Sequence, residues 1–342
     1  GEVYNGPGAE TVSIGVAYPV AQWDGKSNYR QGLELAVQEI NQRGGVLGKP
    51  LNLVIRDDGD DARAAMQIAE TFHQTGITAV VGHWSSDVCY YVEDIYEERG
   101  MIMLAPYANS RVLFELEYRN VFRMIADNSA YAVAMAEYAR ERGFRRMAIY
   151  YAEDTYGTDN AMAMEQELSK QKITVIDRIT SISPASAAGI IRRWRAFGCD
   201  GLIIAAAFSE AAGTVKCIRD AGGDYPVFLT DGFDHTAFGE IMSGYTDNLY
   251  AIVYGTEDME EGFLKRCREA WGRDPTIYEV TGYEAVWLLA DAINAAGTLE
   301  SAGLSLWLKG LRDYPAVMGK ISYNQKTQEF DGHRLRVKPW IE

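Results

Sequence analysis

Short apolar runs alternate with longer amphipathic stretches along most of the chain. Residues 77–110 follow this pattern closely, since the apolar runs Ala79–Val81 and Met101–Leu104 flank a stretch with helical periodicity. Each apolar run ends in small or polar residues, as strands do where they enter loops. The order strand, loop, helix, strand predicts the repeating unit of a parallel β-sheet.

The same alternation continues beyond this stretch. Further predicted strands cover residues 11–17, 51–55, 146–151, 173–177, 201–205, 226–229 and 249–254. Further predicted helices cover residues 27–43, 129–142, 158–170, 186–197, 211–221, 260–271, 278–296 and 301–312. A hairpin of 319–323 with 333–337 is expected to end the chain. Two such series predict an α/β fold with two doubly wound parallel-sheet lobes.

The length and the lack of a linker predict how the lobes are connected. The chain has 342 residues, which exceeds the usual size of a single hydrophobic core. No Pro/Ser/Gly-rich linker separates the two series, so we expect crossovers near 122–128, 249–256 and 319–325. Lobe 1 would then comprise 1–122 plus 255–320, and lobe 2 would comprise 123–254 plus 321–342.

The composition excludes several classes of partner. Apolar content of 47% and charged content of 24% are ordinary for a globular protein. The formal net charge of −15 argues against binding to nucleic acid or to anionic membrane surfaces. No apolar run approaches the length of a membrane-spanning helix, so no membrane insertion is expected. The chain begins like a mature or a trimmed protein, and its start is compatible with a leader that has been removed.

Neither a metal nor a cofactor is expected. The four cysteines are scattered without a CxxC pair, which together with only four histidines argues against zinc. Cys199 and Cys217 could pair in an oxidising compartment, although buried free thiols are the favoured interpretation. The acidic segment 57–61 lacks the spacing of an EF-hand. It is better interpreted as a turn whose carboxylates favour the next helix N-terminus.

Candidate binding residues lie where predicted strands end. Ligands of parallel sheets bind beyond the carboxyl ends of the strands. Ser85 and Ser86 follow one such strand and precede a helix, where a hydroxyl can cap the helix or hold an anion. The chain has no GxSxG elbow, Walker A loop, HExxH or strand-associated GxGxxG, which argues against an enzyme. These features favour a protein that binds a small polar ligand.

Several segments carry a resemblance to a known family. They are TVSIGVAYPVAQ (11–22), NQRGGVLGKPL (41–51), residues 57–61, residues 76–86 and residues 150–157. In these segments the chain resembles the leucine/isoleucine/valine-binding type of periplasmic binding protein, the receptors of branched-chain amino acid ABC transporters. The resemblance implies two α/β lobes joined by three crossovers, with the ligand held in a cleft between them.

The resemblance implies a set of ligand contacts in the first lobe. Trp23 falls where the family has an aromatic wall of the side-chain pocket. Ser85, with Ser86, falls where a serine hydroxyl and backbone N–H groups bind the ligand carboxylate. Ala108 and Asn109 match a loop that contacts both carboxylate and ammonium, with asparagine where threonine is more usual.

In the second lobe the resemblance implies three further contacts. Tyr156 matches an aromatic residue, Phe208 replaces a tyrosine and so lacks its hydroxyl, and Asp231 matches the acid that pairs with the ligand ammonium. Trp84 and Tyr107 lie beside the first-lobe contacts and limit the room for the ligand. A zwitterion does require an anion site, a cation site and a shaped apolar pocket.

Each candidate also has a purely structural interpretation. Ser85 could serve only as a helix cap, Asp231 as a turn residue and Trp23 as packing on the lobe surface. Tyr156 could support a loop-to-helix junction, and His83 could either line the pocket or pack behind it.

The leading hypothesis is a monomeric receptor located outside the cytoplasm, in the periplasm. It would close on an amino acid or related zwitterion and deliver it to an ABC transporter permease. The alternative is a sensor of the same fold for amides, aromatic acids or other small organic solutes. Trp23 and Phe208 suggest a roomier or more aromatic pocket than leucine requires.

Overall fold

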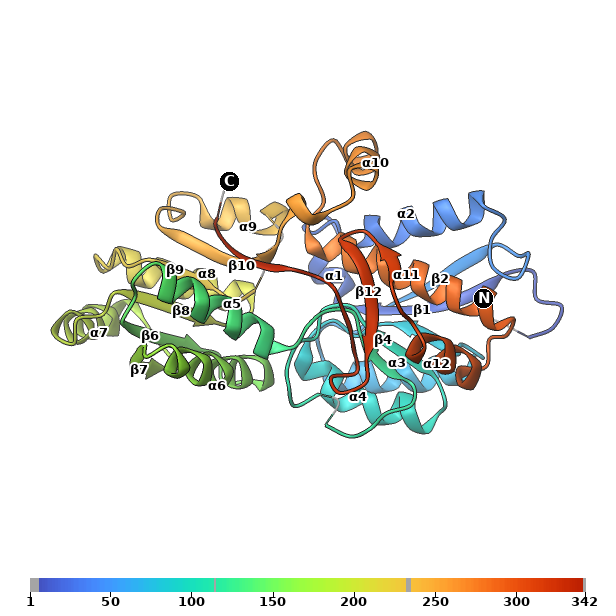
Figure 1. Ribbon diagram of the computed structural model, residues 1–342, viewed down its shortest axis with the longest axis horizontal. Helices are drawn as coiled ribbons and strands as arrows, with labels where there is room; N and C mark the ends of the chain where they lie inside the picture. The colour runs from blue at the N-terminus through green and yellow to red at the C-terminus, as the bar shows by residue number, and fades with distance from the viewer. Residues whose placement is uncertain (1–5, 114, 232–234, 341–342) are drawn as a thin grey trace. The chain divides into compact units, whose positions relative to one another are not determined.

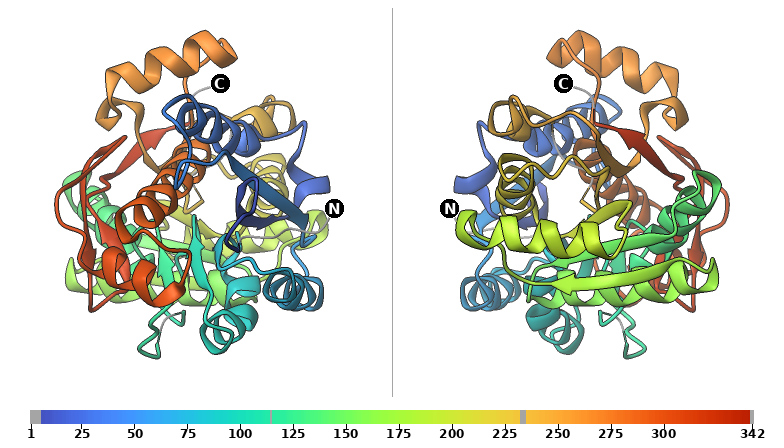
Figure 2. Two further views of the ribbon diagram at one scale, coloured as in Figure 1. Left: turned by 90° about the vertical axis from the view of Figure 1, so that its right-hand side faces the viewer. Right: turned by 90° about the vertical axis from the view of Figure 1, so that its left-hand side faces the viewer.

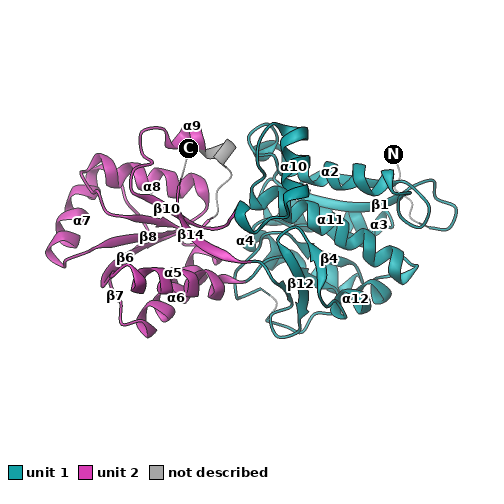
Figure 3. Ribbon diagram, turned by 45° about the horizontal axis from the view of Figure 1, so that its top comes forward, with its two compact units in different colours: residues 1–126, 256–333 teal, residues 127–255, 334–342 magenta. Residues whose placement is uncertain are grey.

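The chain forms two compact units, and each contains one β-sheet. The computed structural model describes residues 6–113, 115–231 and 235–340. Unit 1 comprises the chain up to Ala126 together with Thr256–His333 (Figure 3). Unit 2 comprises Asp127–Gly255 and the segment from Arg334 onward. The chain therefore passes from one unit to the other three times.

The sheet of unit 1 has the strand order β11-β12-β13-β5-β4-β3-β1-β2. Its strands are β1 (Val12–Tyr18), β2 (Leu51–Asp57), β3 (Ala79–Val81), β4 (Ile102–Ala105), β5 (Val121–Arg123), β11 (Tyr314–Ala316), β12 (Gly319–Asn324) and β13 (Glu329–Asp331). Strands β1 to β5 pair in parallel, whereas β12 is antiparallel to both of its neighbours. The buried runs of β1, β3 and β4 fit a sheet covered on both faces.

Two layers of helices cover that sheet (Figure 1). One layer contains α3 (Ala62–Gln74) and α4 (Ser86–Glu98), whose apolar faces share a core with the strands. The other contains α2 (Tyr29–Gln42), α11 (Ile277–Ala296) and α12 (Ser301–Lys309). The remaining helices of unit 1 are α1 (Val20–Trp23), η1 (Thr256–Asp258) and α10 (Glu261–Trp271).

The sheet of unit 2 has the strand order β14-β10-β9-β8-β6-β7. Its strands are β6 (Arg146–Tyr151), β7 (Thr174–Ile179), β8 (Gly201–Ala205), β9 (Val227–Leu229), β10 (Leu249–Tyr254) and β14 (Leu335–Pro339). All pairings are parallel except that of β14 with β10. Figure 2 gives two further views of the ribbon, each turned by 90° from the view of Figure 1.

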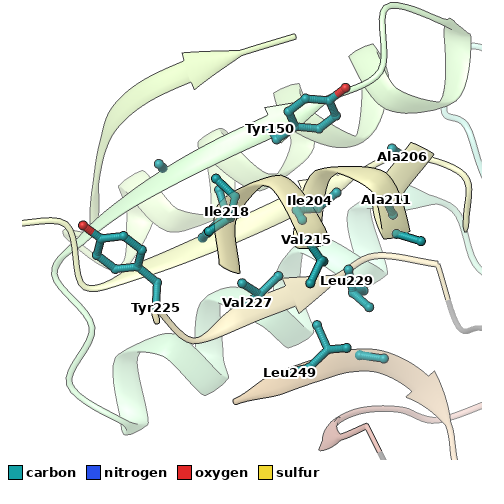
Figure 4. Packing of buried hydrophobic residues seen from close by; sticks show 14 of the residues in the cluster. Tyr150, Ile204, Ala206, Ala211, Val215, Ile218, Tyr225, Val227, Leu229 and Leu249 are labelled. Atoms are coloured by element: carbon teal, nitrogen blue, oxygen red, sulfur yellow. The ribbon is translucent and has the colours of Figure 1, made fainter. Parts of the chain in front are cut away.

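The helices of unit 2 also form two layers. Val215 and Ile218 of α8 (Phe208–Asp220) pack with Val227 and Leu229 of β9, as Figure 4 shows. The same core includes side chains of α7 (Pro184–Ala196) and α9 (His235–Met242). On the opposite face, α5 (Asn128–Glu141) and α6 (Thr155–Lys170) contact the sheet, where Phe228 packs on an aromatic ring of α5. Successive side chains of β9 point to opposite faces of the sheet, so this strand contributes to the core on each face.

The predicted α/β class with two parallel-dominated sheets is confirmed. The predicted hairpin of 319–323 with 333–337 is wrong, because β12 pairs with β13 and β14 pairs with β10. Gln328, with a φ of 53°, closes the β12–β13 turn in the left-handed region. No Asn-Gly or Asp-Gly pair marks that turn in the sequence. Residues 321–333 therefore belong to unit 1, and the third crossing follows His333 rather than lying at 319–325.

Helices α6 and α8 each begin three residues earlier than predicted, which changes the setting of two candidate residues. Helix α6 begins at Thr155 because the Asp154 side chain accepts a hydrogen bond from the Gly157 N–H at 2.7 Å. Tyr156 therefore lies in a first helical turn rather than in a loop. Helix α8 begins at Phe208 rather than at residue 211.

Both sheets contain a topological switch point, where successive connections run to opposite sides. In unit 1 it lies between β1 and β3, since β2 flanks β1 on its other side. In unit 2 it lies between β6 and β8, since β7 flanks β6 on its other side. The loops that leave these strands are where a doubly wound sheet binds ligands.

The close packing of α2 on α11 generates a stability prediction. A Cβ added at Gly32 of α2 would lie 2.4 Å from the carbonyl oxygen of Glu279. Gly32→Ala should therefore lower the free energy of unfolding by about 1–3 kcal/mol or more, because the two helix backbones must separate. The measurement is urea unfolding followed by circular dichroism.

Gly213→Ala is the control for this substitution. Gly213 also lies in a helix, but a Cβ added there meets nothing within 4 Å. This change should raise stability by about 0.5–1 kcal/mol through helix propensity. Equal effects of the two substitutions would contradict the close-packing account.

Candidate functional site

The switch point of unit 1 presents two loops, one after β1 and one after β3. Asp57, at the end of β2, accepts hydrogen bonds from the N–H groups of Val20 and Ala21, both at 3.0 Å. These bonds hold the short helix α1, which ends in Trp23. After β3, a Cβ at Gly82 would lie 2.8 Å from the Ala17 carbonyl oxygen, so glycine lets the second loop approach β1.

An aromatic cluster occupies the switch point. The ring centroids of Trp23 and Trp84 lie 4.7 Å apart, which joins the two loops directly. Trp84 stacks on Tyr107 at 5.1 Å with an interplanar angle of 10°. Tyr278 of α11 meets Trp23, Trp84 and Tyr107 at 5.3, 5.0 and 5.0 Å, and Tyr29 meets Trp84 at 4.7 Å. We call these five residues the aromatic cluster.

A buried polar chain fixes the loop that carries Trp84. His83 Nδ1 lies 2.8 Å from Asp58 Oδ2, and His83 Nε2 lies 2.9 Å from the Tyr96 hydroxyl. All three side chains are buried. His83 therefore packs behind the loop rather than lining a pocket, which settles one of the alternatives that the sequence leaves open.

Ser85 lies directly after Trp84 and caps α4. Its hydroxyl accepts a hydrogen bond from the Val88 N–H at 3.2 Å and donates one to Asp60 Oδ1 at 2.5 Å. Although Asp60 as a residue is exposed, desolvation of its carboxylate raises its pKa. The Ser85 hydrogen bond lowers this pKa, and the charges of Asp58 and Asp87 raise it. Ser85 is thus a helix cap and a carboxylate partner at once.

The loop after β4 lies next to the same helix end. Ser86 Oγ accepts a hydrogen bond from the Ser110 N–H at 3.2 Å, and buried Arg123 donates to the Ser110 carbonyl oxygen at 3.0 Å. Ala108 and Asn109, just before Ser110, are buried in this arrangement. The predicted binding residues of unit 1, which lie in the loops after β1, β3 and β4, thus gather at the carboxyl ends of these strands.

Unit 2 brings Tyr156 to the end of β9. The Tyr156 and Thr230 hydroxyls lie 2.7 Å apart, and Asp231 follows Thr230. The pKa of Tyr156 is raised, first by burial and then by the negative charge of Asp231. Asp231, the residue after Thr230, therefore lies at the same strand end as the Tyr156 hydroxyl.

Phe208 lies at the first position of α8, shortly after the end of β8. It is half-buried at the start of α8 and packs against the hydrophobic core of unit 2. Near it, the Tyr150 hydroxyl at the end of β6 donates to Glu210 Oε1 at 2.6 Å. Burial, followed by this hydrogen bond, raises the pKa of Tyr150 to about 12. Glu210 is therefore a second carboxylate at the strand ends of unit 2.

Sequence reasoning missed several residues of these sites. They are Tyr29, Asp58, Asp60, Glu210 and Tyr278. Tyr29 could have been found, because it lies near the start of the helix predicted over 27–43, which follows the strand predicted over 11–17. Tyr278 lies in α11, which follows another helix rather than a strand, so a search restricted to strand ends overlooks it. The acidic segment is predicted to favour the next helix N-terminus, and Asp61 does cap α3, but that prediction does not include the contacts of Asp58 and Asp60.

The described residues do not meet the requirements of a metal site, a disulfide or a membrane-spanning helix. Among them no group of three or more His, Cys, Asp or Glu side chains could hold a metal ion. All four cysteines are free thiols, and Cys89 and Cys267 are buried. In the part of the chain that the structure describes, no helix combines the length and apolar character needed to cross a membrane.

Two doubly wound units, with candidate ligand contacts at their strand ends, define an α/β binding protein of the two-unit type. The sequence profile of the family described as "Periplasmic binding protein" matches residues 11–336. The chain belongs to this family, which confirms the resemblance that its motifs indicate.

Individual relatives agree with this assignment. The Leu/Ile/Val-binding protein homolog 2 of Brucella abortus (strain 2308) is 25% identical over 324 residues, covering 92% of this chain and 86% of that protein. An ABC transporter substrate-binding protein from Desulfitobacterium hafniense, solved in complex with Leu, is 32% identical with a TM-score of 0.86. The similarity covers 97% of this chain and 98% of that one.

More distant structures share the fold. The branched-chain amino acid transporter substrate binding protein from Streptococcus pneumoniae, solved in complex with isoleucine, has a TM-score of 0.81 at 19% identity. The alignment covers 96% of this chain and 100% of that one.

The buried polar chain behind Trp84 generates a second prediction. Tyr96→Phe removes the hydroxyl that pairs with His83 Nε2 and leaves a buried ring nitrogen without this partner. It should lower the free energy of unfolding by about 1–3 kcal/mol, measured by urea unfolding. Tyr91→Phe is the matched control on the same helix, because Tyr91 is 55% exposed, and it should leave stability unchanged. Equal stabilities of the two variants would refute the structural role of the Tyr96 hydroxyl.

Proposed function

We propose that this protein is a receptor outside the cytoplasm that binds a small apolar amino acid and delivers it to an ABC transporter permease. It would bind without catalysing a reaction. The observation that carries this proposal is the aromatic cluster at the switch point of unit 1, placed directly beside Ser85 and the N-terminus of α4. An apolar surface beside an anion-binding helix end suits the side chain and the carboxylate of one amino acid.

Unit 1 would bind the apolar part of the ligand. Trp84 and Tyr107 are less than one-tenth exposed, and Trp23 is partly exposed. Rings in this setting exclude water and favour burial of a branched aliphatic side chain. Membership of a family with Leu/Ile/Val-binding relatives supports a side chain of this size. So does the 32% identity to a protein solved with Leu.

Unit 2 would bind the ammonium group. Asp231 follows Thr230 at the end of β9, and the Thr230 hydroxyl lies 2.7 Å from the Tyr156 hydroxyl. A carboxylate is a favourable partner for an ammonium group. Glu210 is a second carboxylate at the strand ends of unit 2, and it accepts a hydrogen bond from the Tyr150 hydroxyl. We assign the ammonium to Asp231, because the family resemblance matches this residue to the acid that pairs with the ligand ammonium.

These contacts are sufficient for a useful affinity. A dissociation constant of about 1 μM corresponds to about −8 kcal/mol. Two charge-assisted hydrogen bonds and one buried leucine-sized side chain, each worth about 1.5–3 kcal/mol, supply most of this. Calorimetric titration with L-leucine, L-isoleucine, L-valine, glycine and an aromatic acid tests the proposal. Tight binding of the branched amino acids supports it, and binding of none of these compounds would refute it.

The assignment of the ammonium generates a third prediction. Asp231→Asn keeps the size of the side chain and removes its charge. It should weaken L-leucine binding by at least about tenfold, because a charge-assisted bond becomes a neutral one. Glu210→Gln is the control, since it removes a nearby charge and should change the affinity by less than about twofold. A larger loss in Glu210→Gln than in Asp231→Asn would move the ammonium site to Glu210.

A further inference from the structure

The Ser85 hydroxyl is already engaged by a carboxylate of the chain itself. A hydroxyl has one proton to donate, and Ser85 donates it to Asp60 Oδ1 at 2.5 Å. Its remaining bond is an accepted one, from the Val88 N–H at 3.2 Å. Ser85 therefore cannot donate to a ligand carboxylate while Asp60 holds this position.

The backbone brings Asp60 to this position. Asp60 has a φ of 56°, in the left-handed region, and its N–H donates to Asp58 Oδ1 at 3.0 Å. Asp58 is itself fixed by His83, two residues before Ser85. The turn after β2 and the cap of α4 are thus joined by two carboxylates from one short segment.

The local charges oppose a second anion. Asp60 and Asp87 both lie at the N-terminal end of α4, and Asp58 is close enough to influence the same carboxylate. A ligand carboxylate at Ser85 would add another negative charge to this group. Like charges at such short range repel unless one is neutralised or displaced.

We infer that Asp60 is an intramolecular competitor for the ligand's carboxylate, and that its displacement from Ser85 lowers and tunes the affinity for anionic and zwitterionic ligands. This inference rests on the proposed function and adds a specificity-determining residue to the same site. The Asp60 carboxylate accepts the same Ser85 hydrogen bond that the ligand carboxylate would accept. If Asp60 occupies Ser85 in most molecules, only the remaining fraction can bind the ligand carboxylate, and the apparent affinity is lowered by that fraction.

The test compares Asp60→Asn with the wild type by calorimetric titration with L-leucine. Asparagine tolerates the left-handed conformation, so the turn should persist. It lacks the charge that holds the Ser85 proton strongly, and L-leucine should bind about tenfold more tightly or better. Asp60→Gly, which also tolerates that conformation, should give the same direction of change.

Two comparisons separate direct competition from a general effect of charge. Asp87→Asn removes a charge from the same helix end without removing the Asp60–Ser85 bond, and should change the affinity by less than about threefold. L-leucinamide lacks the carboxylate, so Asp60→Asn should not tighten its binding. Weaker L-leucine binding in Asp60→Asn would make Asp60 a ligand contact and overturn the inference, as would an unchanged affinity.

Acetate tests the competition independently of the ligand's identity. At constant ionic strength, acetate should raise the melting temperature of Asp60→Asn more than that of the wild type or of Asp60→Asn/Ser85→Ala. If this holds and no amino acid binds, the proposed function fails while the competition stands. If L-leucine binds the wild type and Asp60→Asn equally, the receptor function stands and the competition is wrong. Equal acetate shifts in all three proteins would also overturn the inference.

Discussion

The hydrogen bond between Asp58 and His83 is the constraint on which the candidate site of unit 1 depends. It joins the ends of β2 and β3, the strands on either side of β1, and both of its partners are buried. The binding candidates are their near neighbours in sequence, since Trp84 and Ser85 follow His83 and Asp60 follows Asp58. A buried pair of this kind is costly to break, because each partner would remain without water. This hydrogen bond therefore fixes the Trp84 ring, the Ser85 hydroxyl and the Asp60 carboxylate relative to one another.

The two units differ in the chemistry that their strand ends present. Unit 1 presents aromatic rings and a capped helix end, whereas unit 2 presents the Tyr156 and Thr230 hydroxyls with the Asp231 carboxylate. A zwitterion with an apolar side chain requires both kinds of surface. Because the loops are held by rigid parallel sheets, small changes of side chain can alter the ligand without altering the fold.

Much of this architecture could be predicted from the sequence. Apolar runs located most of the parallel strands of both sheets, the strand-end rule led to Ser85, and the family resemblance led to Asp231. The third crossing could not be placed, because the turn closed by Gln328 lacks the usual glycine signal. The contact of Asp60 with Ser85 joins residues 25 positions apart. Such a contact depends on the three-dimensional turn, which no local pattern encodes.

A crystal structure of the protein with a saturating concentration of the amino acid that binds it most tightly tests the central claim most directly. The account predicts an apolar side chain against Trp84 and Tyr107, a carboxylate at Ser85 with Asp60 displaced, and an ammonium group at Asp231. A ligand bound away from the strand ends, or one whose ammonium rather than carboxylate meets Ser85 and Asp60, would contradict it.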